Sequence, residues 1–500
     1  MLKKRLLAFV TAAVLTGIPM YAPAHVAAEQ QIVGYRGDLN QDGTVNLEDV
    51  LMLSKHLTNA SPCKEADTAQ FGDMNEDHTL NAMDLTLLKR AVLTNSEPEP
   101  IYKTQKPPIA AVNQTMPTRG TVRVPMFIVS FPDCPQTTTL TAAEIQERCF
   151  RPADPTILSY PMESMSAYFE RASYGRLKLE GDVYEYTAEN PISKYVKAKD
   201  FLLSEILSAL DAEIDYTKYD ANKDGVMDAV IAVLPKDAGE TWRATTGVCL
   251  LKETFDGIKV SKRCVGKSNI DLYTKFHSTW LHELTHTMGL PDYYKYTDDG
   301  NGIFGMYGDA GWELMDDGFG DLSAFSKLML GWYDAGEVQV YTGGTQTFEL
   351  QSGQTAPGCV LIPRGELNGY MSEYFALEYD TNTGNNTRYF VEQHIYPIFS
   401  QGGLRVLHCD AELWNGFWGP ELKWNNYGQM YDDSNQKQRV LRLANEAEKG
   451  AFFQAGSTVD GRISGFHWYD SEGGQTVDTG VKITVDSITD GVCKLTISPN

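Results

Sequence analysis

The 500-residue chain lacks several features that mark common protein classes. None of its eight cysteines lies in a C-x-x-C pair, so zinc-ribbon and thioredoxin-like sites are excluded. No internal apolar run is long enough to span a bilayer, which argues against membrane insertion. Basic residues are scarce, 43 against 66 acidic ones. The net charge of -23 argues against a nucleic-acid partner, because such binding needs a basic face.

The first residues differ from the rest of the chain. Three cations at positions 3–5 precede an apolar stretch that reaches about position 21, and small residues follow. This order is typical of an export signal, so residues 1–28 are predicted to be a signal peptide of a secreted, extracellular protein. The alternative is an uncleaved membrane anchor, which Gly17 and Pro19 disfavour because they weaken the apolar run.

Four of the cysteines form two pairs that are close in sequence. Disulfides between Cys134 and Cys149, and between Cys249 and Cys264, would close two short loops in an oxidising compartment. Buried free thiols are the alternative, and the sequence does not decide between the two.

A repeat near the N-terminus predicts calcium binding. Residues 38–49 read DLNQDGTVNLED and residues 73–84 read DMNEDHTLNAMD, so the two segments match at every oxygen-bearing position. Ca²⁺ takes about six to eight oxygen ligands from a tightly curved loop. The predicted ligands are Asp38, Asn40, Asp42, Thr44 through its carbonyl, and Asp49, and then Asp73, Asn75, Asp77, Thr79 and Asp84. Each loop leads into a predicted apolar helix, over 47–57 and 82–93, and the two helices should pack together.

This paired pattern resembles a type I dockerin over residues 34–95, with Asn46 and Asn81 at position 9 and Asp at position 12. The resemblance implies a small all-α domain with two Ca²⁺ ions. It also implies docking onto a cohesin domain of a scaffold protein, as in cellulosome-type assemblies. The implied recognition residues are Leu47, Glu48, Ser54 and Lys55 in the first repeat, and Ala82, Met83, Lys89 and Arg90 in the second. A calcium-stapled spacer without a partner is the alternative.

A second motif predicts a metal centre. His282 and His286, in LHELTHTMGLPDYY, are one helical turn apart and share one face of a helix. Two imidazoles at this spacing can hold one Zn²⁺, and Glu283 beside them can take a proton from water. Gly289 can end the helix in a left-handed turn that sends the chain back toward the metal. Asp292 then follows as the predicted third ligand, because a carboxylate binds zinc.

The arrangement HExxHxxGxxD resembles the immune inhibitor A-like metallopeptidases, a metzincin-like family. Met315, in the segment GWELM, fits the Met-turn of that family, although a methionine alone is more often plain core. Segments 123–133, 164–177, 373–379 and 403–410 extend the resemblance over residues 120–500. The resemblance implies a zinc endopeptidase acting on protein or peptide substrates. It implies one catalytic Zn²⁺ on His282, His286 and Asp292, with Glu283 as the catalytic residue.

A third calcium-like loop lies inside this region. Residues 220–228 read DANKDGVMD, in which the predicted ligands are Asp220, Asn222, Asp224 and Asp228. The loop predicts one structural Ca²⁺ ion. A polar turn without metal is the alternative, because this loop has no second copy beside it.

Together these patterns predict a multidomain protein. The dockerin is followed by a proline-rich linker over 96–119, an α+β metzincin-like protease domain over 120–335, and a β-rich region over 336–500. The last region has the short alternating segments of a β-sandwich or jelly roll. A dockerin-borne carbohydrate-active enzyme is one alternative function, but it needs a carboxylate pair that the sequence does not single out. A non-catalytic adaptor is the other, and the intact metal motif argues against it.

Overall fold

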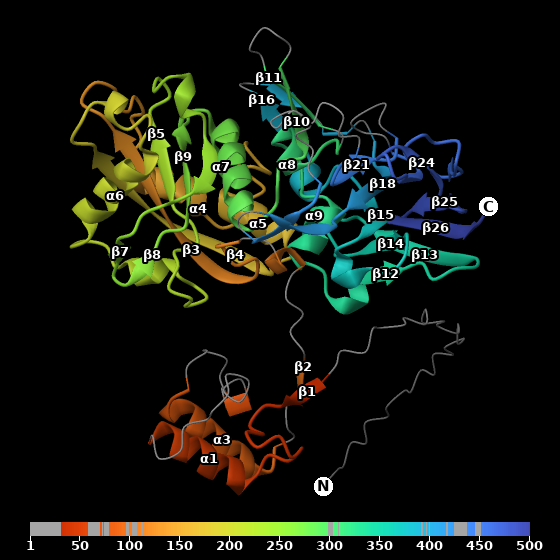
Figure 1. Ribbon diagram of the computed structural model, residues 1–500, viewed down its shortest axis with the longest axis horizontal. Coiled ribbons are helices and arrows are strands. Elements are labelled where there is room, and N and C mark those ends of the chain that lie inside the picture. Colours follow the sequence, from red (N-terminus) through yellow and green to blue (C-terminus); the bar gives the residue numbers. More distant parts are fainter. Residues whose placement is uncertain are drawn as a thin grey trace, which may run out of the picture. The chain divides into compact units, whose positions relative to one another are not determined.

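The computed structural model describes two compact units, Met1–Lys103 and Thr104–Asn500, which are treated separately (Figure 1). The described residues are 32–58, 71–72, 74, 80–96, 100–102, 108–111, 114–298, 304–308, 310–391, 394–396, 398–399, 401–416, 419–424, 438–445 and 452–500. The predicted signal peptide and the calcium ligands Asp73, Asn75, Asp77 and Thr79 lie outside them. No helix among these residues is long and apolar enough to cross a membrane.

The N-terminal unit contains a helix pair, α1 (Leu47–Leu57) and α3 (Ala82–Thr94). Both helices begin with a capping box, in which an asparagine and the aspartate three residues later satisfy each other's backbone N–H groups. The residues of these boxes are Asn46 with Asp49 and Asn81 with Asp84. Leu39, Val50, Leu53 and Leu88 form the shared buried core. Both predicted helices are therefore confirmed.

Part of the predicted linker is structured. Strand β2 (Pro100–Tyr102) pairs antiparallel with β1 (Ile32–Tyr35), near the start of the same unit. Pro108–Ala111 form a 3-10 turn, and its Ile109 is fully buried in the core of the second unit. The predicted linker therefore contains regular secondary structure, because distant segments supply a strand partner and an apolar environment that its proline content does not reveal.

The second unit starts with a mixed five-stranded sheet in the order β4-β3-β5-β9-β6. Its strands are β3 (Gly120–Ser130), β4 (Leu177–Thr187), β5 (Ile231–Leu234), β6 (Thr245–Val248) and β9 (Lys262–Lys267). All pairs are parallel except that of β6 with β9. Helices α4 (Ala142–Phe150), α5 (Met165–Ala172) and α7 (Tyr273–Thr287) cover one face, and α6 (Lys199–Leu210) covers the other (Figure 1).

Successive side chains of each strand point to opposite faces of this sheet, so the core is divided into two layers, one on each face. Both faces of this sheet are covered, so apolar side chains of β3 enter both layers, as expected for a buried parallel sheet. Cys149 and Cys264 belong to the layer with α7, whereas Cys249 belongs to the layer with α6 and Cys134 packs against that layer. Every cysteine among the described residues is a free thiol. Of the two alternatives left open by the sequence, the structure therefore has free thiols at these four positions, because the sheet separates the members of each pair.

Two further sheets form the C-terminal part of this unit. The first has the order β12-β14-β15-β18-β21 and the second β13-β26-β25-β22. Their strands are β12 (Val338–Val340), β13 (Gln346–Gln351), β14 (Cys359–Pro363), β15 (Glu373–Asp380), β18 (Gly403–Asp410), β21 (Leu441–Leu443), β22 (Thr458–Val459), β25 (Val481–Thr489) and β26 (Val492–Pro499). All pairs are antiparallel except β12 with β14.

The first of these sheets is buried on both faces. One face shares a core with the second sheet, and the other contributes Tyr374, Ala376, Leu407 and Cys409 to the core that contains α7. The predicted boundary between residues 335 and 336 therefore crosses a shared hydrophobic core.

A buried ion cluster joins the C-terminal sheet to the segment before Met315. Arg405 on β18 is 2% exposed. Its guanidinium lies 2.6 Å from Glu378 and 2.8 Å from Asp380, both on β15, and donates to the carbonyl of Trp312 at 2.9 Å. One cation is thus paired with two buried carboxylates, whose other oxygens accept from the N–H of Ala324 and the amide of Gln354.

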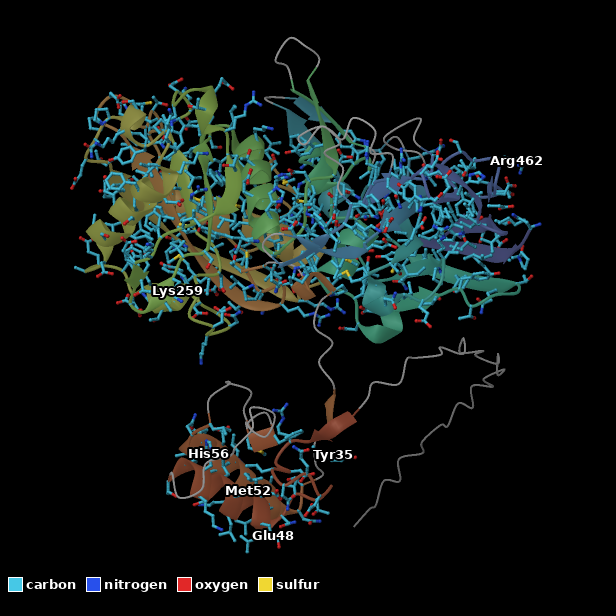
Figure 2. The ribbon with its side chains drawn as sticks, in the orientation of Figure 1. Tyr35, Glu48, Met52, His56, Lys259 and Arg462 are labelled. Carbon is cyan, nitrogen blue, oxygen red and sulfur yellow. The ribbon has the colours of Figure 1, made fainter. Side chains whose placement is uncertain are left out.

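Arg405→Met is expected to lower the free energy of unfolding by about 3–5 kcal/mol, because it leaves buried carboxylates uncompensated. Chemical denaturation followed by tryptophan fluorescence measures this loss. Arg462→Met is the matched control, since Arg462 is an exposed arginine at the edge of the unit that is paired with Asp460 (Figure 2). The control should unfold like the parent, and an unchanged midpoint for Arg405→Met would contradict the assignment.

Candidate metal centre

Helix α7 and the turn after it bring three predicted metal ligands together. The helix ends at Thr287, and Gly289 has a φ of 106°, a left-handed conformation that glycine adopts without strain. Asp292 Oδ1 lies 2.8 Å from His282 Nε2 and 3.2 Å from His286 Nε2. The two Nε2 atoms are 3.1 Å apart. The left-handed turn thus returns the carboxylate to the imidazoles.

Backbone carbonyls fix which nitrogen of each imidazole faces this centre. His282 Nδ1 lies 3.1 Å from the carbonyl oxygen of Leu314, and His286 Nδ1 lies 2.7 Å from that of Leu290. A carbonyl only accepts, so each Nδ1 carries a proton and each neutral ring presents a lone pair at Nε2. Two lone pairs and a carboxylate oxygen therefore converge, and this arrangement is repulsive unless a cation lies among them.

The donor set fits zinc. Zinc bonds to imidazole nitrogen and carboxylate oxygen of about 2.0–2.2 Å place tetrahedral ligand atoms roughly 3.3 Å apart. The three separations here, 2.8, 3.1 and 3.2 Å, are close to that value. A backbone carbonyl that accepts from Nδ1 is one of the usual partners that orient zinc-binding histidines in proteins.

The local charges favour a cation at this position. Burial by itself lowers the pKa of His286, but the neighbouring Asp292 carboxylate and the charge of Glu283 outweigh burial and raise the pKa to about 9. Burial likewise disfavours the Asp292 carboxylate, yet the two imidazoles hold the pKa of Asp292 well below its usual range. The centre therefore stabilises positive charge, which a proton or a metal ion supplies.

The segment that contains Met315 is hydrogen-bonded to His282 and to the residue that follows Asp292. Met315 is fully buried, and the preceding Leu314 provides the carbonyl that orients His282. The Met315 carbonyl accepts the N–H of Tyr293, the residue after the third ligand, at 2.9 Å. Buried Glu313 accepts the hydroxyl of Ser326 at 2.6 Å and the N–H of Met315, and these bonds stabilise this segment.

Glu283 lies beside the centre and contacts a residue that sequence analysis did not single out. Thr246 Oγ1, on the edge strand β6, is 2.8 Å from Glu283 Oε2 and 2.7 Å from the Glu283 main-chain oxygen. Glu283 is 6% exposed. Because Thr246 lies on a strand, 37 residues before Glu283 in the sequence, no local pattern marks it as part of the site.

The first dockerin loop is folded around its predicted ligands. Asp38 Oδ1 and Oδ2 accept the N–H groups of Asp42 and Gly43 at 3.1 and 2.9 Å. The Asp42 side chain accepts the N–H of Thr44 at 2.9 Å, and the Asn40 amide donates to Asp42 at 2.9 Å. Asp49 is fully buried and accepts the N–H groups of Leu39 and Asn46 at 2.8 and 2.9 Å.

The second dockerin loop is described only at residue 74 and from residue 80 onward. Asp84 is fully buried and accepts the N–H groups of Met74 and Asn81 at 2.9 and 2.8 Å, which repeats the role of Asp49. The predicted recognition residues lie on α1 and α3 and are exposed, except that Ser54 is half-buried. They are Leu47, Glu48 (labelled in Figure 2), Ser54, Lys55, Ala82, Met83, Lys89 and Arg90.

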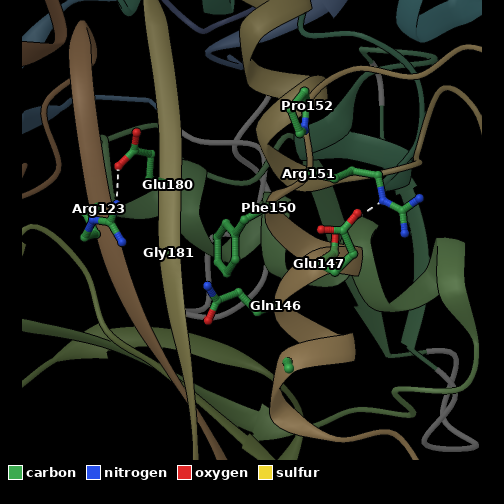
Figure 3. Close-up of a pocket in the computed structure, with 9 residues that line it drawn as sticks. Arg123, Gln146, Glu147, Phe150, Arg151, Pro152, Glu180 and Gly181 are labelled. Carbon is green, nitrogen blue, oxygen red and sulfur yellow. Dashed lines mark hydrogen bonds and ion pairs between the residues drawn. The ribbon is translucent and has the colours of Figure 1, made fainter.

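A pocket of about 410 Å³ lies apart from the metal ligands, between α4 and strands β3 and β4 (Figure 3). Its walls include Phe150, Arg151 and Arg123. Arg123 is already paired with Glu180 at 2.5 Å and with Asp182 at 2.8 Å. The pocket contains none of the predicted catalytic or metal-binding residues.

Comparison with known families identifies the first unit. The Dockerin type I domain family matches residues 36–95, so this stretch is a type I dockerin domain. Such a domain implies bound calcium, a cohesin partner and attachment of the cellulosome type. The match covers a minor part of the chain and leaves the second unit without an assigned family.

Comparisons for the rest of the chain are weak. No curated protein matches it. Among solved structures, wild-type OgpA from Akkermansia muciniphila is 13% identical with a TM-score of 0.25, covering 60% of this chain and 92% of that one. A second crystal form of the same protein is 14% identical with a TM-score of 0.24, covering 63% of this chain and 87% of that one. Catalytically inactive OgpA in complex with an O-glycopeptide is 13% identical with a TM-score of 0.23, covering 60% of this chain and 92% of that one. TM-scores this low carry no inference about fold or activity.

Proposed function

We propose that this chain is a secreted zinc-dependent endopeptidase that its dockerin domain attaches to a cohesin-bearing scaffold. One observation carries the proposal for the second unit: His282 Nε2, His286 Nε2 and Asp292 Oδ1 converge within 3.2 Å of one another, with both Nδ1 atoms on backbone carbonyls. Glu283, on the same helix, places a second carboxylate beside this set. The dockerin domain supports the scaffold-bound, extracellular part of the proposal.

In this proposal the three convergent groups hold one Zn²⁺ ion. When bound, zinc supplies a Lewis acid that lowers the pKa of water toward ~7 and polarises the scissile carbonyl. The backbone carbonyls of Leu314 and Leu290 keep the imidazoles in the tautomer that can bind a metal. The chain's own residues thus fix the ligand geometry before substrate arrives.

Glu283 is the proposed general base and acid. Thr246 holds Oε2, and Oε1 accepts the proton of the attacking water in this scheme. The same oxygen then delivers the proton to the nitrogen of the leaving amine. The low exposure of Glu283 keeps bulk water from competing for this carboxylate. Thr246 is a positioning residue, because it acts on the reaction only through Glu283.

The proposed function is tested by digesting casein with the purified full chain and measuring its zinc content in parallel. Hydrolysis by material that carries one zinc ion per chain is the expected result. A chelator should remove both zinc and activity, and added zinc should restore them. Pure folded material that hydrolyses casein without zinc, or that binds zinc but does not hydrolyse peptide bonds, would overturn the proposal.

Thr246→Val is expected to lower kcat by about 10- to 100-fold with little change in KM, because a misplaced catalytic group slows the chemical step. Steady-state kinetics on a fluorogenic peptide measures both constants. Thr246→Ser keeps the hydroxyl and should retain most of the activity. Both variants should keep one zinc ion per chain, since Thr246 contacts none of the three ligands. Equal kcat values for the Val and Ser variants would refute the positioning role.

A further inference from the structure

A nine-residue loop in the second unit, residues 220–228, has the same internal bonding as the first dockerin loop. In both, the aspartate at position 1 accepts the N–H groups of positions 5 and 6: Asp38 at 3.1 and 2.9 Å, and Asp220 at 3.0 and 2.8 Å. In both, the aspartate at position 5 accepts the N–H of position 7, at 2.9 and 2.8 Å, and the side-chain amide of position 3, at 2.9 Å each.

The backbone of the two loops also agrees. Position 4 is left-handed in both, with φ of 56° at Gln41 and 58° at Lys223. Position 6 is a glycine in both, with φ of 87° at Gly43 and 80° at Gly225. The second unit therefore contains a loop with the conformation of a type I dockerin calcium loop, although its sequence neighbours are different.

The two loops differ in the carboxylate that closes them. In the dockerin loop this is Asp49 at position 12, whose Oδ1 accepts the N–H of Leu39 at position 2. In the second unit it is Asp228 at position 9, whose Oδ2 accepts the N–H of Ala221 at position 2, at 2.9 Å. Asp228 thus makes the contact that Asp49 makes in the dockerin loop. It lies three positions earlier in its loop, so the loop is shorter but is closed by the same contact.

The second carboxylate oxygen of Asp228 is the observation that indicates a bound ligand. Asp228 is fully buried, and its Oδ1 has no hydrogen-bond partner within the part of the chain that the structure describes. Asp49, by contrast, uses its second oxygen for the N–H of Asn46. A buried carboxylate oxygen without a partner is costly. Burial, together with the charges of Asp220 and Asp224, raises the pKa of Asp228 to about 7. A cation in the loop would supply the missing partner and offset the repulsion.

We propose that residues 220–228 bind one Ca²⁺ ion, a third calcium site that is independent of the dockerin domain. Its ligands are the carboxylates of Asp220, Asp224 and Asp228, the amide oxygen of Asn222, and the main-chain carbonyl of Val226, which corresponds to that of Thr44. The ligand set consists only of oxygen atoms on a curved loop, which suits calcium and not zinc.

The position of this loop gives the ion a structural role. The N–H of Asp228 donates to the carbonyl of Tyr219 at 2.8 Å, just before the loop, and the central strand β5 begins shortly after it. Met227 and Gly225 bond through their backbones to Lys259 (labelled in Figure 2), in the hairpin of β7 (Thr254–Phe255) and β8 (Ile258–Lys259). Bound calcium therefore holds the start of β5 and this hairpin in place.

The test counts calcium ions per full-length chain by equilibrium dialysis with metal analysis. The parent should bind three ions. Asp42→Ala with Asp77→Ala disables both dockerin loops and should leave one ion, and adding Asp224→Ala should remove it. Asp224 is exposed, so its loss is not expected to unfold the second unit.

Asp211→Ala is the matched control, because it removes an exposed carboxylate outside the loop. This variant should still bind three ions. The Asp224→Ala variant alone should bind two calcium ions. Its second unit should unfold at the same temperature with and without calcium. Two ions in the parent, or none in a folded double dockerin variant, would overturn the third site. The count needs no peptidase activity, so it is separate from the test of the proposed function.

Discussion

Glu283→Gln is expected to lower kcat for peptide hydrolysis by roughly 10²–10⁴-fold, the usual contribution of a general base. The substitution keeps the size of the side chain and an oxygen that can accept from Thr246, but it removes the ability to take a proton from water. The three proposed zinc ligands are unchanged, so the variant should still carry one zinc ion per chain. Steady-state kinetics on a peptide substrate, with metal analysis of the same sample, measures both quantities.

The matched control for this variant is Glu213→Gln, which makes the same change at an exposed glutamate after α6. It should hydrolyse the peptide at the parent rate. If Glu283→Gln were as active as this control while both retained zinc, Glu283 would not be the base, and the mechanism would need another proton acceptor. If Glu283→Gln lost zinc as well, its inactivity would reflect the metal site and the assigned role would be wrong.

Asp49→Ala combined with Asp84→Ala is expected to weaken cohesin binding by at least about 100-fold while peptide hydrolysis stays at the parent rate. Both aspartates are fully buried, and both accept backbone N–H groups from the loop and from the helix start. Each substitution removes the aspartate half of a capping box, at about 1 kcal/mol, together with a proposed calcium ligand. Loop folding and calcium binding are linked, so the helix pair should lose its order.

Binding to immobilised type I cohesin domains measures the first effect, and far-UV circular dichroism of the full chain with and without calcium measures the second. Asp211→Ala with Glu213→Ala removes two exposed carboxylates outside the loops and should bind cohesin like the parent. Unchanged cohesin capture by the double dockerin variant would contradict the calcium-dependent docking. Lost hydrolysis in that variant would show that the two units are not independent.

Local sequence patterns predicted the parts of the site that lie on one element. The i, i+4 spacing of His282 and His286 and the turn at Gly289 depend on contacts within a few residues. The dockerin helices start at the predicted residues, 47 and 82, each directly after an asparagine cap. Such features follow from backbone geometry and side-chain period, so they can be read before any tertiary contact is known.

Contacts between distant elements could not be predicted in this way. Thr246 contacts Glu283 because edge strand β6 packs beside α7, and the carbonyl of Leu314 orients His282 because a later segment passes below the helix. The state of the four cysteines stayed open in the sequence for the same reason, since a sheet built from distant strands separates the members of each pair. The pairing register and the exposure of those strands are set by the packing of the whole core, so short sequence segments do not reveal them.

The amino-acid sequence by itself determined the type I dockerin repeat, the ends of its helices and the residues of the metal motif, because hydrogen bonds and periodicity within short segments fix them. Tertiary structure alone decided which nitrogen of His282 faces the centre, that Thr246 contacts Glu283, and that Asp228 keeps one buried oxygen without a partner in the described part of the chain. These outcomes depend on carbonyls, strands and burial supplied by remote segments, whose approach is set by packing of the whole unit.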